Sequence, residues 1–373
     1  MTFQLYRALS YQNEINIGFE PHTQEDASII DRYSADAFGV FAMTSYGKTL
    51  FVRNLLVQLK DRRIIIFDSR GEHKHLRTTN AANADGKGDS IPDLVYIERF
   101  GFKLSDMINA QDWKALGLNI SGARICAGIA RQKNSHRNEI ELFLELIDDI
   151  KTKGKDASLY MTKMSILAKV KNVSSCFVDN SAVDITHSHP DKIRYTNNPF
   201  YISDWKYFIK AHKHVCINFN SEYQPFKAQF FAGKLLNEIS PILRYEPAVI
   251  LLEEAHNLFP YSDAPSANDE LYSSNRIYYY LKSKHKDMVK LIFVTQHPRQ
   301  LNSSAFDEIK WYFIGKLENI DGSSRISEMF KMSNMLNYNP LNDYREWLCY
   351  SSIYNKKFVF VPYDSATFYM RRK

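Results

Sequence analysis

Two carboxylates stand side by side at the end of an apolar segment. Residues 248–252 read Ala-Val-Ile-Leu-Leu, and Glu253 and Glu254 follow directly. The apolar run predicts a buried strand, and two adjacent carboxylates are costly to bury unless a cation lies nearby. Such a pair suits metal-assisted hydrolysis of a phosphate ester, with Glu253 holding Mg²⁺ through water and Glu254 activating the attacking water as general base. The alternative is an acidic pair that caps the following helix.

A phosphate-binding loop is predicted upstream. Residues 42–49 read Ala-Met-Thr-Ser-Tyr-Gly-Lys-Thr and match the pattern G-x-x-x-x-G-K-[ST] except at the first position. An apolar strand at 38–41 and a helix at 50–60 flank the loop, as that pattern requires. Backbone N–H groups of such a loop surround the β-phosphate, and the positive end of the helix points at the same anion. The alternative is a surface turn with an incidental lysine.

The predicted roles follow from side-chain chemistry. Lys48 is expected to reach the β- and γ-phosphates, Thr49 to offer its hydroxyl to Mg²⁺, and Gly47 to let backbone and phosphate approach closely. The predicted ligands are therefore ATP and Mg²⁺. The residues expected to line the nucleotide are Ala42, Thr44, Ser45, Tyr46, Gly47, Lys48, Thr49 and Leu50.

A third polar position ends another apolar segment. Residues 291–296 read Leu-Ile-Phe-Val-Thr-Gln, which predicts a buried strand with Gln296 at its tip. A glutamine beside a phosphate site can orient the attacking water or contact the γ-phosphate. The alternative is an amide that bonds to a neighbouring loop.

The motifs, in this order, resemble those of the HerA/FtsK superfamily of P-loop ATPases, and of its HerA-like branch in particular. The resemblance rests on four stretches, of which Ile-Ile-Ile-Phe-Asp-Ser-Arg-Gly-Glu-His and Glu-Glu-Ala-His-Asn-Leu are the most distinctive; they are residues 42–49, 64–73, 249–259 and 293–298. It covers residues 36–75 and 205–320. It implies a ring, six copies being the expected number, that hydrolyses ATP at subunit interfaces to move duplex DNA. Asp68 and Glu72 are then expected to support the site or to act between subunits.

The sequence departs from the family pattern at two places. Relatives usually carry Gly at position 42 and Gly-Ser at 45 and 46, where this chain has Ala, Ser and Tyr. They also carry a Gly-Arg-Lys run before the glutamine strand, whose arginine reaches the nucleotide of the neighbouring subunit. Residues 281–290 contain no arginine. The residue that reaches the neighbouring subunit's nucleotide is therefore expected to be either Arg276, the nearest arginine upstream, or one of Lys282, Lys284 and Lys286. A lysine is a poorer partner for phosphate than an arginine.

Composition limits the class of protein. The chain has 373 residues, of which 45% are hydrophobic, and its net charge is +6, which suits but does not require a nucleic-acid partner. Its four cysteines form no Cys-x-x-Cys pair, and it contains no apolar run long enough to cross a membrane. We therefore expect a cytoplasmic protein, or one in the host cytoplasm if a virus or plasmid encodes it, with no membrane segment.

The predicted fold is α/β. Strands alternate with helices, which favours a P-loop NTPase (RecA-like) core in which helices flank a mostly parallel sheet. Residues 1–35 are expected to form an N-terminal cap, residues 36–103 and 200–373 the ATPase core, and residues 104–199 an inserted, mostly helical subdomain. The nucleotide is expected at the carboxyl ends of the strands.

Three functions remain open from the sequence. The first is a DNA translocase for end processing, genome packaging, plasmid transfer or defence, with a nuclease, a capsid or a transfer apparatus as partner. The second is an ATPase that powers protein secretion or virion assembly. The third is a nucleotide-gated scaffold that does not hydrolyse ATP, which the intact Glu253, Glu254 and Gln296 argue against.

Overall fold

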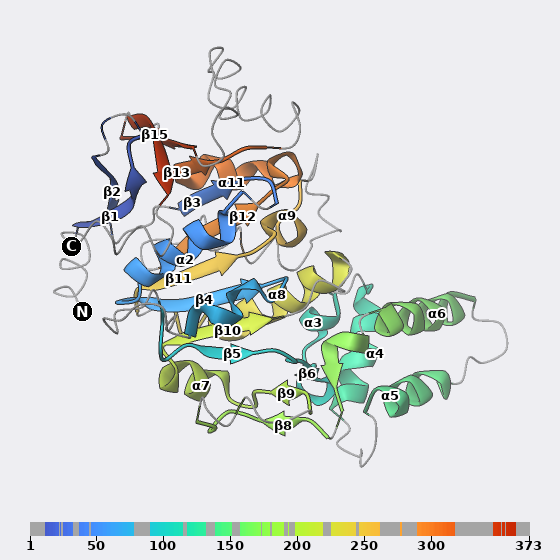
Figure 1. The fold of residues 1–373 in the computed structure, drawn as a ribbon. Helices are drawn as coiled ribbons and strands as arrows, with labels where there is room; N and C mark the ends of the chain where they lie inside the picture. The colour runs from blue at the N-terminus through green and yellow to red at the C-terminus, as the bar shows by residue number, and fades with distance from the viewer. Residues whose placement is uncertain are drawn as a thin grey trace, which may run out of the picture.

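One large sheet organises the protein (Figure 1). The computed structural model describes residues 12–21, 23, 25–32, 37–44, 46–77, 90–114, 118–131, 139–150, 157–172, 174–179, 181–189, 193, 198–218, 225–243, 246–261, 277, 289–317, 346–351, 353–354 and 356–362. Within these ranges, 11 strands form the sheet in the order β2-β1-β15-β14-β13-β3-β12-β11-β4-β10-β5. Their bounds are β1 (Gln12–Phe19), β2 (Asp26–Arg32), β3 (Ala37–Phe41), β4 (Arg63–Asp68), β5 (Val95–Ile97), β10 (His214–Asn218), β11 (Ala248–Leu252), β12 (Val289–Thr295), β13 (Ile309–Ile314), β14 (Trp347–Ser351) and β15 (Lys356–Pro362).

The sheet has a parallel part and an antiparallel part. Strands β5, β10, β4, β11, β12, β3 and β13 run parallel to one another, whereas β14, β15, β1 and β2 continue the sheet in antiparallel pairs. The predicted α/β fold with a mostly parallel sheet is confirmed. Strand β14 pairs with β15 in antiparallel register. Residues expected to form an N-terminal cap supply β1 and β2, which lengthen the main sheet through β15.

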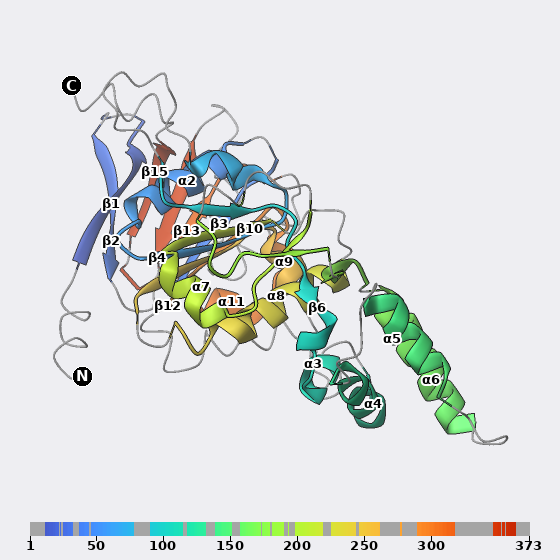
Figure 2. The same cartoon turned by 90° about the horizontal axis from the view of Figure 1, so that it is seen from below.

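Alternation along the central strands builds two apolar layers. In β4, Ile64 and Ile66 face the layer of α2 (Lys48–Gln58), while Ile65 and Phe67 face the layer of α8 (Pro225–Ile239). Because both faces are covered, these strands are continuously apolar, as parallel strands in α/β proteins are. Figure 2 shows α2 on one face of the sheet and α7 (Trp205–Ala211), α8 and α11 (Ser303–Glu308) on the other.

A helical region continues from one edge of the sheet. It contains α3 (Ala110–Lys114), α4 (Ile120–Ala130), α5 (Glu139–Asp148) and α6 (Ala157–Asn172), of which α5 and α6 project away from the sheet (Figures 1 and 2). Two short strand pairs accompany the helices: β6 (Phe102–Lys103) with β7 (Phe177–Val178), and β8 (Val183–Asp184) with β9 (Phe200–Tyr201). Trp113 stacks on Phe143 at 5.0 Å, and both belong to the same apolar layer as α8. The predicted subdomain at 104–199 thus shares its core with the sheet.

The predicted helix boundaries are close to the observed ones. The helix expected at 50–60 is α2 at Lys48–Gln58. A one-turn helix, α9 (Ala255–Leu258), follows the acidic pair. The described backbone also contains four short 3-10 segments: η1 (Glu72–Arg77), η2 (Leu104–Asp106), η3 (Ser174–Cys176) and η6 (Pro298–Gln300). In the described part of the chain, no helix combines the length and apolarity that crossing a membrane requires.

A buried ion pair joins α3 to α8. Lys234 Nζ lies 3.1 Å from Asp112 Oδ2 and 2.7 Å from Glu238 Oε1, and Lys234 and Asp112 are both almost fully buried. Burial alone would lower the pKa of Lys234, but the two carboxylates hold it above its ordinary value. This pair ties the helical region to the sheet layer.

Asp112→Ala should therefore destabilise the fold by about 3 kcal/mol, because the buried ammonium of Lys234 would keep only the partly exposed Glu238 of its two carboxylate partners. Glu238→Ala is the matched control, since Glu238 is partly exposed and its loss should cost about 1 kcal/mol or less. The free energy of unfolding in urea measures both. Equal losses for the two variants would contradict the assignment of Asp112 as the main partner.

Candidate nucleotide site

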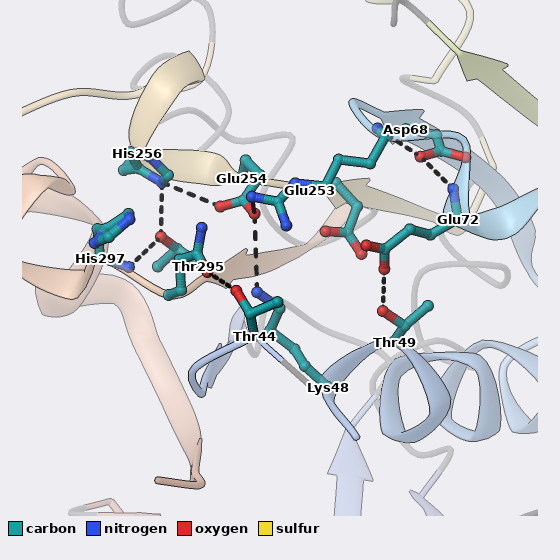
Figure 3. Close-up of polar contacts among 12 residues, drawn as sticks. Thr44, Lys48, Thr49, Asp68, Glu72, Glu253, Glu254, His256, Thr295 and His297 are labelled. Atoms are coloured by element: carbon teal, nitrogen blue, oxygen red, sulfur yellow. Dashed lines mark hydrogen bonds and ion pairs between the residues drawn. The ribbon is translucent and has the colours of Figure 1, made fainter. Parts of the chain in front are cut away.

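The predicted site residues converge at one edge of the sheet. Strands β3, β12, β11 and β4 are neighbours in that order and run parallel, so the segments that follow them meet at their carboxyl ends. Those segments are the phosphate loop after β3, Gln296 after β12, the acidic pair after β11 and the Asp68 loop after β4. Figure 3 shows Lys48, Thr49, Glu72, Glu253 and Glu254 directed toward one another from these elements.

Gly47 opens α2 in the way a phosphate loop requires. Its φ of 84° and ψ of 11° lie in the left-handed region, which glycine adopts without the penalty that a side chain pays. The helix begins at Lys48, and its N-cap makes no side-chain hydrogen bond, so its first N–H groups are open to an anion. Lys48 is 7% exposed, and its Nζ lies 4.0 Å from Glu254 Oε1.

The side chains that depart from the family pattern at positions 42 and 46 are both buried beside Gly315. Tyr46 is buried against Trp347 of β14, and its hydroxyl donates to the backbone oxygen of Glu346 at 2.8 Å. Ala42 is fully buried beside Gly315, where an added Cβ would lie 2.5 Å from the Tyr46 ring and 2.9 Å from the Ala42 Cβ. The larger residues at 42 and 46 are therefore accommodated by a glycine on the segment after β13. The Tyr46 side chain anchors the loop to β14.

Asp68 organises the loop that follows β4. It is fully buried, and its Oδ1 accepts N–H bonds from Arg70, Gly71 and Glu72 at 3.1, 2.8 and 3.2 Å, while Oδ2 accepts one from His73 at 3.0 Å. Gly71, with φ of 73°, makes the turn. These hydrogen bonds fix the backbone of residues 70–73. They therefore fix the positions from which the side chains of Arg70, Glu72 and His73 extend.

Glu253 is held by His73, a contact that the sequence did not predict. His73 Nε2 lies 2.9 Å from Glu253 Oε1, and both side chains are buried. Burial opposes ionisation of Glu253, but the hydrogen bond and charge of His73, together with Lys48 and Arg70, lower its pKa below the ordinary value. Glu253 is therefore an anion at neutral pH and His73 is the donor.

Glu254 has the opposite electrostatic character. Burial raises its pKa above the ordinary value, although Lys48 and Arg70 oppose that shift. Arg70 Nη2 lies 2.6 Å from Glu254 Oε1, and neither carboxylate oxygen has a hydrogen bond of good geometry. Among the described residues, Glu254 is the one non-glycine with positive φ, at 46°. Backbone strain of this kind concentrates at functional sites.

Two histidines border Glu254. His256 Nδ1 lies 2.8 Å from Thr295 Oγ1 and 3.5 Å from Glu254 Oε2 (Figure 3). Burial, with His297, Lys48 and Arg70 as further causes, lowers the pKa of His256 to about 4. The ring is therefore neutral at neutral pH, and its approach to Glu254 is a polar contact rather than an ion pair. His297 packs on His256 at 4.9 Å.

Gln296 meets the phosphate loop. Thr44 Oγ1 donates to Gln296 Oε1 at 2.5 Å, which links the loop after β3 to the tip of β12. The predicted glutamine is thus placed beside the loop. Leu50 lies in the first turn of α2. Ser45 and Arg276, together with Lys282, Lys284 and Lys286, lie outside the described residues.

The donor set fits a magnesium ion. Thr49 Oγ1 hydrogen-bonds Glu72 Oε2, and the carboxylate of Glu253 faces the same space (Figure 3). Magnesium in phosphate-transfer sites binds one or two carboxylates, substrate phosphates and several waters. No group of three or more His, Cys, Asp or Glu side chains in the described part of the chain is arranged to hold a metal by itself. The ion would therefore enter with the nucleotide, held by Thr49 and Glu253, with Glu72 beside them.

Comparison with known proteins agrees with this geometry. Residues 30–175 match the family model described as DUF87, the central domain of helicase HerA. The predicted resemblance is confirmed, and the match extends from the phosphate loop into the helical region, where the sequence motifs said little. A comparison with curated proteins finds no match.

Solved structures share the fold. VirB4 of Thermoanaerobacter pseudethanolicus is 11% identical, with a TM-score of 0.57, and the alignment covers 95% of this chain and 98% of that one. The plasmid coupling protein TrwB, in complex with a non-hydrolysable GTP analogue, is 9% identical with a TM-score of 0.49, covering 98% and 86%. The packaging NTPase B204 of Sulfolobus turreted icosahedral virus 2, in complex with ATP-gammaS, is 9% identical with a TM-score of 0.40, covering 88% and 98%. The likeness to VirB4 shows the fold alone.

Gly315→Ala should weaken nucleotide binding by tenfold or more, because the added methyl group collides with Tyr46 and Ala42 and displaces the phosphate loop. Gly128→Ala is the matched control: Gly128 lies within α4, and an added Cβ there meets nothing within 4 Å. A fluorescent ATP analogue measures affinity, and circular dichroism checks the fold. Wild-type affinity in a folded Gly315→Ala protein would show that Gly315 does not support the loop.

Proposed function

We propose that this protein is an ATP-hydrolysing motor of the HerA type that moves duplex DNA. The observation that carries the hydrolytic part is the state of Glu254. Its carboxylate is buried at a strand tip, has a raised pKa and strained backbone, and lies beside the phosphate-loop lysine. A buried carboxylate with a raised pKa beside a phosphate-binding lysine is better suited to accept a proton from water than to cap a helix.

Each residue of the site has a separate part in the proposed hydrolysis of ATP. Gly47 and the open N-terminus of α2 receive the phosphates, and Lys48 neutralises their charge. Glu254 accepts a proton from water as the water oxygen bonds to the γ-phosphorus and the bond to the bridging oxygen breaks, which yields ADP and phosphate. Gln296, held by Thr44, would orient that water. Magnesium, when bound, would stabilise the charge on the phosphate oxygens beside Thr49 and Glu253.

DNA as the cargo rests on the family match and on charge. The central domain matched here is that of helicase HerA, and the chain carries a net charge of +6. A ring of six copies would place a cation of one subunit at the nucleotide of the next, with Arg276, Lys282, Lys284 and Lys286 as the candidates. A nuclease, a capsid or a transfer apparatus would be the partner in end processing, packaging or plasmid transfer.

Glu254→Gln should lower the turnover of ATP by about 100-fold or more while leaving nucleotide binding intact, because glutamine keeps the shape and cannot accept the proton. Steady-state hydrolysis, measured with and without linear duplex DNA, tests the proposal. The wild type should hydrolyse ATP faster when DNA is present, and the variant should not respond.

The remaining outcomes separate the other functions. Hydrolysis that ignores DNA would contradict the DNA motor and favour an ATPase for secretion or assembly. Nucleotide binding without hydrolysis, in the ring and with DNA, would contradict the enzyme and favour a scaffold. Rapid turnover by Glu254→Gln would remove Glu254 from the role of base.

A further inference from the structure

Arg70 stands at the centre of the site without a role in the predicted chemistry. It lies on the loop between β4 and η1, and its guanidinium forms the shortest ion pair in the described site, 2.6 Å from Glu254 Oε1. The amine of Lys48 lies 4.0 Å from the same oxygen. Two cations from different elements thus share one oxygen of the residue proposed as general base.

The pairing with Arg70 is incompatible with full activity of that base. At 2.6 Å the guanidinium of Arg70 covers Glu254 Oε1 and keeps a water molecule from reaching that oxygen. Without a compensating charge, however, a carboxylate as buried as Glu254 would be costly to keep ionised. Arg70 therefore stabilises Glu254 before catalysis but must leave it during catalysis.

The loop allows Arg70 to change partner without refolding. Four N–H bonds to Asp68 fix the backbone of residues 70–73, so the side chain moves from a fixed base. That side chain is 35% exposed, whereas Lys48 and Glu254 are buried, so its path to the solvent side is open. A terminal phosphate held by Lys48 carries more negative charge than one carboxylate and matches the guanidinium fork in geometry.

We propose that Arg70 is a switch cation within its own subunit, pairing with Glu254 when no γ-phosphate is bound and with the γ-phosphate of ATP when it is. The transfer frees Glu254 to accept the proton of the attacking water only when ATP is present. It also makes the site distinguish ATP from ADP, because ADP lacks the group to which Arg70 moves. The inference rests on the proposed ATP hydrolysis at this site.

The test compares binding and turnover in Arg70→Ala, Arg70→Lys and the wild type. Arg70→Ala should lower the affinity for ATPγS about tenfold or more, the loss expected for a hydrogen bond to a charged group, and should leave ADP affinity within about twofold. Its kcat for ATP should fall as well. Arg70→Lys should recover part of both losses, because it keeps the charge and loses the fork. Arg131→Ala, an exposed arginine at the end of α4, is the matched control.

Each outcome separates the switch from other roles and from the proposed function itself. Equal losses of ATPγS and ADP affinity would reduce Arg70 to a structural support and overturn the inference. Faster hydrolysis by Arg70→Ala would overturn it too, since Arg70 would then be a simple latch on Glu254. If the wild type binds neither nucleotide, the proposed function fails, whereas normal wild-type turnover with an unaffected Arg70→Ala overturns the switch alone.

Discussion

The site depends on one buried carboxylate, Asp68, which is held by backbone N–H groups of its own loop. Asp68 ends β4 in the middle of the parallel sheet, and it accepts backbone N–H bonds from four consecutive residues. A carboxylate with this many donors is held in one position. Because the loop starts from Asp68, Arg70 reaches Glu254, Glu72 reaches Thr49 and His73 reaches Glu253. Three residues of one loop thereby contact three residues assigned to phosphate chemistry.

These contacts give two adjacent carboxylates opposite pKa shifts. Glu253 has a hydrogen-bond donor in His73 and a lowered pKa, which suits a residue that holds a metal's water shell. The negative charge of Glu254 is balanced by the nearby cations Lys48 and Arg70. Burial raises the pKa of Glu254, which suits a residue that takes up a proton. A pair of titratable groups whose environments separate their pKa values is the usual mark of divided acid–base roles. The neutral ring of His256 borders Glu254 without cancelling its charge.

Much of this arrangement was predictable from the sequence, because parallel strands bring their carboxyl ends to one edge. The strand-ending positions of Asp68, Glu253 and Gln296 were sufficient to place them together. The roles of Arg70 and His73 were missed, since a side chain's reach across the sheet depends on the loop conformation. The signal was present in Asp68 followed by a glycine at position 71, which marks a turn folding back on the carboxylate. The accommodation of Tyr46 by Gly315 required knowing that β13 lies beside β3.

Steady-state ATP hydrolysis by Asp68→Asn tests most directly whether this buried carboxylate assembles the site. Asparagine keeps the shape, but it removes the charge and turns one acceptor into a donor that faces the His73 N–H. With the fold intact by circular dichroism, we expect kcat to fall about tenfold or more, because Arg70, Glu72 and His73 lose their common anchor. Wild-type kcat and KM in the folded variant would contradict the account.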